Sequence, residues 1–250
     1  MFILLLVLGF IIGGFVIAMG GGGAAFYLGI LTGLVHIAPA SAAATSLFTA
    51  LPSLCIGAYS HYRTGNMRFK FGNRMLIAAV PATIIGSIIA EFLDENIYKW
   101  LIFLVFLLLG LQVIWQSFHH HESKNTQMTA QLNPGKAYFF GTLSGLMVGI
   151  AGLSGGSPLV AGMLLMGLSM QEAAATSSYA LIITSIVGIL MHSTEGNIAW
   201  GAGIALMIGA IIGSALMPAL LSRFNSRKVT KVLRPLMGAI MIIMAVTTVA

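Results

Sequence analysis

The feature that most constrains this chain is an internal duplication, which relates residues 19–66 to residues 150–197 at a constant offset of 131. Each copy opens with a glycine-rich interruption of an apolar run, and the Ala-Ala-Ala-Thr-Ser sequence at 42–46 returns at 173–177. Two hydrophobic halves, each interrupted by glycine at one equivalent place, are typical of secondary transporters whose binding site lies between broken helices.

The composition places most of the chain in lipid. Of its 250 residues, 58% are hydrophobic and 7% are charged, and the mean hydropathy is +0.98. Such a chain has too little polar surface to cover a soluble core, so we expect a polytopic membrane protein. Nine of the twelve Lys and Arg residues fall in 60–74 and 222–234, which indicates membrane topology rather than nucleic-acid binding. Cys55 is the only cysteine, so an intrachain disulfide is excluded.

Turn and charge signals divide each half into five apolar segments. They are 2–18, 24–35, 40–59, 72–91 and 96–117, then 136–151, 158–168, 170–191, 200–221 and 229–249. As helices, 24–35 and 158–168 would reach only about 16 to 18 Å, against a bilayer core of about 30 Å. These two segments are therefore predicted to be half-helices, and the broken backbone before each should line a polar cavity.

Charge differs between loops at equivalent positions in the two copies. The basic loop 60–74 corresponds to 191–205, which contains Glu195 and no basic residue, and the basic loop 222–234 corresponds to the mainly acidic 91–99. By the positive-inside rule the two halves are then inverted, which requires an odd number of crossings in each. A re-entrant hairpin with three full spans gives that parity, and five crossings also fit. A parallel duplication with four spans per half would instead place 222–234 outside.

The predicted fold class is an all-α polytopic integral membrane protein with two homologous, inverted repeats. Each repeat has a glycine-broken short helix or re-entrant hairpin and about three to four full transmembrane helices. We assign 1–117 to the first transmembrane repeat, 118–135 to a polar cytoplasmic linker and 136–250 to the second repeat. The run His119–His121 favours a solvated linker over a metal site, because three adjacent helical residues do not share one face.

Each half also carries a glycine-rich stretch, a short apolar run and a Thr-Ser pair. The stretches and pairs are Gly20 to Gly23 with Thr45-Ser46, and Gly152 to Pro158 with Thr176-Ser177. In this pattern the chain resembles, over nearly its whole length, the TauE/SafE family of sulfite and organosulfonate exporters of bacterial membranes. The resemblance implies a multi-pass transporter of the bacterial inner (cell) membrane, with no enzymatic activity. The first copy departs from the pattern because Tyr27 stands where the second has proline.

The glycine clusters suggest an anion site. Each precedes a short helix, so free amides and the positive end of the helix dipole would face the break, where glycine lets an oxyanion approach the backbone. The Thr and Ser hydroxyls could donate further hydrogen bonds. The predicted substrate-binding residues are Gly20, Gly21, Gly22, Gly23, Thr45, Ser46, Gly152, Ser154, Gly155, Gly156, Ser157, Thr176 and Ser177. The alternative roles are close helix packing for the glycines and bonding to the preceding helical turn for the hydroxyls.

Three titratable residues near the breaks are candidates for proton coupling. His61 and His192 occupy equivalent positions and can titrate near neutral pH. Glu172 lies beside the second short helix, where the first copy has Ser41, and acids near a transport pathway are costly unless used. The alternatives are interfacial histidines and a glutamate that caps a helix or lies exposed in a loop.

The sequence has no phosphate-binding loop and no metal-ligand spacing, so we expect no cofactor, no metal and transport driven by a gradient. The leading hypothesis is a secondary transporter that works by alternating access with proton or ion coupling. By the resemblance, its substrates are small sulfur oxyanions such as sulfite, sulfoacetate or other organosulfonates. The alternatives are an anion channel, a transporter of another small anion, and a membrane scaffold. The expected partners are a small anionic substrate and membrane lipid but no nucleic acid, with homodimerisation left open.

Overall fold

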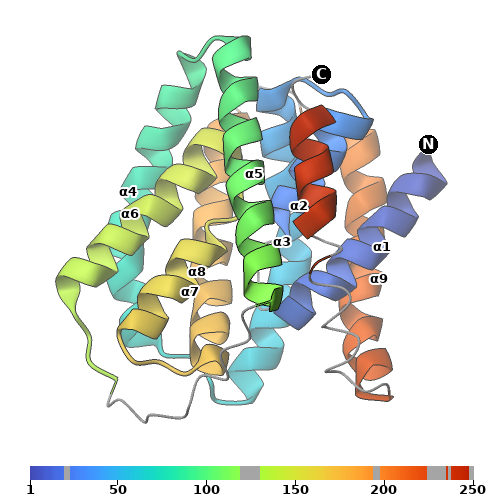
Figure 1. Ribbon diagram of the computed structural model, residues 1–250. Coiled ribbons are helices and arrows are strands. Elements are labelled where there is room, and N and C mark those ends of the chain that lie inside the picture. The colour runs from blue at the N-terminus through green and yellow to red at the C-terminus, as the bar shows by residue number, and fades with distance from the viewer. Residues whose placement is uncertain (20–22, 119–129, 194–197, 224–234, 236–237, 248–250) are drawn as a thin grey trace.

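The computed structural model describes residues 1–19, 23–118, 130–193, 198–223, 235 and 238–247, and these residues form helices and connecting turns without strands (Figure 1). The helices are α1 (Phe2–Met19), α2 (Ala24–Gly29) with the π-helical turn η1 (Ile30–Leu34), α3 (Pro39–Arg63), α4 (Phe69–Glu91), α5 (Glu95–Phe118), α6 (Pro134–Ala151), α7 (Gly156–Leu165), α8 (Met170–Ser193), α9 (Trp200–Arg223) and a C-terminal helix (Gly238–Thr247). Each apolar segment predicted from the sequence overlaps a helix, which confirms the all-α class.

Several predicted elements lie outside the described residues. They are Gly20 to Gly22 of the first glycine cluster, His119 to His121 with most of the linker, Glu195 and most of the basic loop 222–234.

The first basic loop is shorter than predicted. Helix α3 continues to Arg63 and α4 begins at Phe69, so the predicted loop 60–74 is a turn over 64–68. Hydropathy marked only the apolar run, whereas the helix extends through polar residues until Gly65, which has a φ of 72°. That left-handed conformation is one that glycine adopts without steric cost, and it reverses the chain there.

The chain folds back on itself between α6 and α7. Asn133 caps α6 by accepting a hydrogen bond from the Lys136 amide at 3.1 Å, and Gly152 ends the helix. Helix α7 then returns beside α6, with its Gly162 against Phe140. Just outside the pair, the Gln131 amide donates to the Met166 carbonyl at 3.0 Å. The chain therefore enters and leaves this hairpin at the same end, as expected for a re-entrant segment.

Helices from the two halves pack against each other. Gly141, Gly145 and Gly149 of α6 lie against the backbone of α4, and Gly209 and Gly213 of α9 lie against the backbone of α1. A residue larger than glycine would hold these backbones apart, and small residues serve this purpose in membrane helices generally. Each pair joins one helix of the first half to one of the second, so the two halves share a single core.

Helices α3 and α8, which hold the equivalent Ala-Ala-Ala-Thr-Ser sequences, pack together in the middle of the bundle. They run antiparallel. Leu47, near the start of α3, contacts Gly188 near the end of α8, whereas the amide of Arg68, just beyond the end of α3, donates to Thr176 near the start of α8. Equivalent helices of the two copies therefore point in opposite directions at the centre of the molecule.

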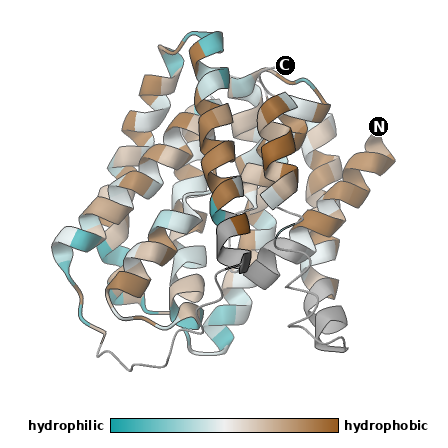
Figure 2. Cartoon of the chain, in the orientation of Figure 1, coloured by the Kyte–Doolittle hydropathy of each residue, from teal (hydrophilic) through white to brown (hydrophobic). Residues whose placement is uncertain are grey.

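The outer surface of the bundle suits a lipid environment. Helices α3, α4 and α8 are long and apolar enough to cross a membrane. Large apolar side chains such as Ile77, Leu104 and Leu190 are exposed on the helix sides, and Figure 2 shows that hydrophilic residues concentrate near helix ends and turns. The chain is a membrane protein, as its composition indicated.

Candidate functional site

The second glycine break begins at Gly152, which has a φ of 60° and is buried. Its amide donates to the Val148 carbonyl at 2.9 Å, which closes the last turn of α6. A side chain there would be strained by the left-handed backbone, and its Cβ would lie 2.5 Å from the Cα of Ala43 on α3. Glycine is therefore required both by the backbone conformation and by the close approach of α3.

The Thr-Ser pair of the first copy contacts the break of the second. The Ser46 hydroxyl lies 3.0 Å from the Gly152 carbonyl and 2.8 Å from the Ala43 carbonyl of its own helix, so it can donate to either. Ser46 and Gly152, both predicted as site residues, are thus brought together although they are far apart in the sequence. The break is part of the interface between the halves.

Beyond Gly152, the break presents the start of α7. Gly155 is its N-cap, and the Gly155 carbonyl accepts a hydrogen bond from Ser144 of α6 at 2.8 Å. The first amides of a helix have no partner within it, so the amides at Gly156 and Ser157 point out of the start of α7. Ser154 lies just before them, is 7% exposed, and its hydroxyl has no hydrogen-bond partner among the described residues. These groups are hydrogen-bond donors, which is the chemistry that binding of an oxyanion requires.

The remaining hydroxyls of the two Thr-Ser pairs bond to backbone. The Thr45 hydroxyl donates to the Ser41 carbonyl at 2.6 Å, and Ser177 donates to the Ala174 carbonyl at 3.0 Å. Thr176 accepts from the Arg68 amide at 2.9 Å. The bonds of Thr45 and Ser177 to the preceding helical turn are the alternative that the sequence left open for these hydroxyls, whereas the bond of Thr176 joins the two halves.

The first break is described only from Gly23 onward. Gly23 is buried and precedes α2, every residue of which is buried. The equivalence of the two breaks at Gly20 to Gly22 stays a prediction.

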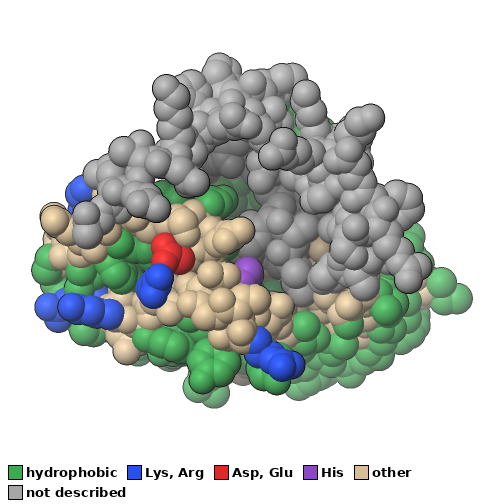
Figure 3. Space-filling view, turned by 90° about the horizontal axis from the view of Figure 1, so that it is seen from below, with side chains coloured by type: hydrophobic (Ala, Val, Ile, Leu, Met, Phe, Trp, Pro, Cys, Tyr) green, Lys and Arg blue, Asp and Glu red, His purple; other side chains and the backbone are tan. Residues whose placement is uncertain are grey.

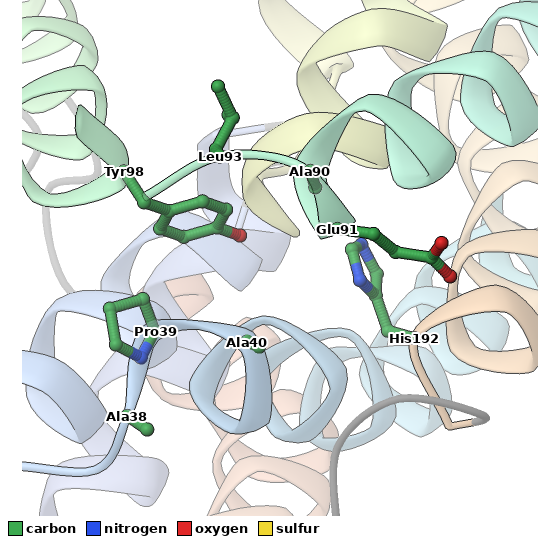
Figure 4. A pocket seen from close by; sticks show the side chains of 8 residues that line it. All are labelled: Ala38, Pro39, Ala40, Ala90, Glu91, Leu93, Tyr98 and His192. Atoms are coloured by element: carbon green, nitrogen blue, oxygen red, sulfur yellow. The ribbon is translucent and has the colours of Figure 1, made fainter. Parts of the chain in front are cut away.

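A cavity of about 500 Å³ lies where α3 and α5 begin and α4 and α8 end (Figure 4). It is lined by Ala38 just before α3, Pro39 and Ala40 at the start of α3, Ala90 and Glu91 at the end of α4, Leu93 in the following turn, Tyr98 of α5 and His192 of α8. Most of this lining is apolar. The polar groups come from Glu91, Tyr98 and His192, so the cavity has a small number of positions that can orient a ligand.

His192 is the most unusual of these residues. It is 1% exposed, and neither of its ring nitrogens forms a hydrogen bond of good geometry within the described chain, although the backbone of Val148 and Gly149 is close enough for a weak one. Buried polar groups are almost always well paired, so a poorly paired imidazole on a cavity wall marks a place where a ligand or water could bond. Val148 and Gly149, in the last turn of α6, lie beside the imidazole. The cavity therefore reaches within one helical turn of the glycine break.

The other two proton-coupling candidates lie elsewhere. His61 is in the last turn of α3, half-buried, and is not among the residues that line this cavity. Glu172 forms an ion pair with Arg68, and its second carboxylate oxygen accepts from the Ser169 amide at 2.9 Å and the Ser169 hydroxyl at 3.0 Å. Ser169 and Glu172 form a capping box at the start of α8. This is the helix-capping role that the sequence left open for Glu172.

The comparison with known proteins fixes the family. The model of the sulfite exporter TauE/SafE family matches residues 5–248. The chain belongs to the TauE/SafE family. Two similar proteins of Bacillus subtilis are the probable membrane transporter proteins YdhB, 26% identical over 215 residues, and YunE, 28% identical over 260 residues. These alignments cover 86% of this chain and 84% of YdhB, and 93% of this chain and 93% of YunE. No solved structure matches. The protein is a membrane transporter of the TauE/SafE family, as the sequence predicted.

Sequence reasoning about this TauE/SafE protein missed three polar residues. Tyr27 on α2 and Ser53 on α3 are buried close to each other, but neither hydroxyl forms a hydrogen bond of good geometry among the described residues. The substitution of tyrosine for the proline of the other copy was the signal for Tyr27. Glu91, interpreted as a loop residue, is the last residue of α4 and lines the cavity. In the described part of the chain, no group of three or more His, Cys, Asp and Glu side chains could hold a metal.

Proposed function

We propose that this protein is a secondary transporter that moves a small sulfur oxyanion, such as sulfite, sulfoacetate or another organosulfonate, across the inner membrane of a bacterium. The family match supports this class of substrate, and the names of the two Bacillus subtilis relatives support membrane transport. The chain crosses the membrane several times and needs no enzymatic step.

The cavity that contains His192 is the observation that carries the proposal. Backbone that leaves its helix at membrane depth is tolerated where it lines a polar cavity. The imidazole lies beside Val148, whose carbonyl holds the Gly152 amide at the break. An anion that enters the cavity would meet His192 first, and then the amides and the Ser154 hydroxyl at the start of α7. These donors stabilise negative charge without a permanently buried cation, which favours binding and later release.

Inverted repeats and alternating access complete the proposal. The antiparallel arrangement of α3 and α8 supports inversion, and so does the exchange of basic and acidic loops between the copies. Two inverted halves can expose a site between them to one side and then to the other, because each half supplies an equivalent gate. The sequence lacks a phosphate-binding loop, which supports a proton or ion gradient as the energy source, with His192 and His61 as candidate groups for proton coupling.

The test is anion flux into vesicles that contain the purified protein. Sulfite, sulfoacetate, taurine and a carboxylate of matched size are supplied in turn, with and without a pH gradient. The His192→Gln variant should lose most of the flux. A matched control is His36→Asn, because His36 is exposed and lies outside the cavity, and asparagine tolerates its φ of 55°.

Saturable flux that depends on His192 supports the carrier. Currents resolvable from single molecules would instead support an anion channel. Equal flux in the two histidine variants would show that the cavity is not part of the transport pathway. Saturable flux of the carboxylate alone would show that the substrate is another small anion.

A further inference from the structure

Helices α3 and α8 each contact the start of a helix from the opposite half of the chain. Helix α8 contacts the start of α4, and α3 contacts the start of α9. At one end, Thr176 of α8 accepts from the Arg68 amide at 2.9 Å, and the ring of Tyr179 meets that of Phe69 edge to face with centroids 5.1 Å apart. We name this contact the α8 clasp, and it also includes Glu172 and Asn73. It joins α8 to the turn between α3 and α4.

The opposite end has the equivalent contact. Thr45 of α3 accepts from the Ala199 amide at 3.1 Å, and the ring of Phe48 meets that of Trp200 edge to face with centroids 5.3 Å apart. We name this contact the α3 clasp. Every one of its residues is related to its counterpart in the α8 clasp by the offset of 131, so the two clasps are two copies of one device.

The α8 clasp contains two polar bonds that the α3 clasp cannot form. Arg68 Nε donates to Glu172 Oε1 at 2.7 Å, and the Tyr179 hydroxyl donates to Asn73 Oδ1 at 2.9 Å. The equivalent positions of the α3 clasp are Ala199 paired with Ser41, and Phe48 paired with Ile204. Those side chains have neither the charges nor the hydroxyl that the bonds require, so among the described residues these two bonds occur at one end only.

The α8 clasp, which has the two additional polar bonds, lies at the end of the bundle that is rich in basic residues. Arg63, Arg68, Lys70 and Arg74 surround the turn between α3 and α4, and by the positive-inside rule this end faces the cytoplasm. Figure 3 shows this face, where basic side chains gather and an acidic side chain lies against a basic one. The cavity lies at the other end, beside the last turn of α8.

We propose that the α8 clasp is the cytoplasmic gate of the transporter, and that the Arg68–Glu172 pair sets the balance between its closed and open states. This inference rests on the proposed alternating access. For the site to open to the cytoplasm, the start of α4 must separate from the start of α8, which breaks the ion pair. Opening at the α3 clasp breaks no such pair. The pair therefore favours the state in which the cytoplasmic end is closed and the cavity end is accessible.

The duplication supplies matched reporters for both ends. Spin labels on cysteines at Lys70 and Gln171 report the α8 clasp, and labels at the equivalent Gly201 and Ala40 report the α3 clasp. All four positions are exposed, and Cys55 is replaced by alanine so that no other thiol is labelled. Distance distributions are measured for each pair in full-length protein in lipid nanodiscs, with no substrate added.

Two single variants remove the pair's charges. Arg68→Gln and Glu172→Gln should each raise the long-distance population at the α8 clasp about two- to fivefold, the range that a half-exposed ion pair supports. Glutamine at 172 keeps an oxygen that can accept from Ser169, so the capping box survives and the charge alone is tested. The double substitution Ser41→Glu with Ala199→Arg transfers the pair to the α3 clasp, and should shift the balance the other way.

Unchanged distances at the α8 clasp in both single variants would overturn the gate, whether or not the protein transports anions. Shifted distances without flux of any anion would support the gate and overturn the proposed function. An equal shift at both clasps in Arg68→Gln would also contradict the gate, because it would show general loosening of the bundle.

Discussion

Replacement of Gly152 by alanine tests whether the glycine break is held by packing between the halves. The methyl group must adopt a backbone with a φ of 60°, and it would lie 2.5 Å from both Cα and Cβ of Ala43. The left-handed backbone costs about 1–2 kcal/mol for a residue with a side chain. The overlap with α3 adds about 1–3 kcal/mol, as overpacking does in well-packed cores. We therefore expect Gly152→Ala to lower the free energy of unfolding by about 2–5 kcal/mol.

Gly65 provides the matched control. Its φ is 72°, and a Cβ there would meet nothing within 4 Å. Gly65→Ala should therefore lose only the backbone contribution of about 1–2 kcal/mol. Reversible unfolding in mixed micelles, with increasing denaturing detergent, measures both variants on one scale. If Gly152→Ala lost no more stability than Gly65→Ala, α3 would not lie against the break as described.

Three further changes follow from the same contacts. Ser46→Ala should lose about 1–3 kcal/mol of stability, because the carbonyl in the break loses its buried donor, whereas Ser177→Ala removes a bond within one helix and should change the same unfolding midpoint little. Gly155→Leu should lower the yield of folded protein, since its Cβ would collide with α6, and normal monodispersity in size-exclusion chromatography would contradict that packing. Anion binding should strengthen as the pH falls, because an imidazolium at His192 can face the anion, and His192→Gln should remove that pH dependence in a thermal-shift titration.

Several features of the candidate site could be predicted from the sequence. The glycine cluster at 152–156 marked the break because its glycines and Ser154 interrupt the apolar run that a continuous spanning helix requires. The equivalence with His61 predicts a titratable residue at His192, but not its burial. Glu172 was recognised as either a coupling residue or a cap, and the Ser-x-x-Glu spacing from Ser169 is a local signal for the cap.

The partners of these residues could not be predicted. Hydroxyl groups of Thr45, Ser46 and Thr176 are used in contacts between the halves, and nothing local in the sequence separates that use from substrate binding. The cavity could not be predicted either, because its lining comes from the ends of four helices, α3, α4, α5 and α8, that are far apart in the sequence. Hydropathy also placed the end of α3 too early, since it measures apolar character and not helix continuity.

The sequence by itself determined the duplication, the all-helical membrane class, the short helices after the glycines and the family. These depend on composition and on patterns within about 20 residues, where hydrophobicity and glycine act directly on the backbone. Only the tertiary structure decided that α4 pairs with α6 and α9 with α1, that Ser46 meets Gly152, and that Arg68 reaches Glu172. Those contacts join residues far apart in the sequence, and they depend on how closely glycine lets helices of the two halves approach.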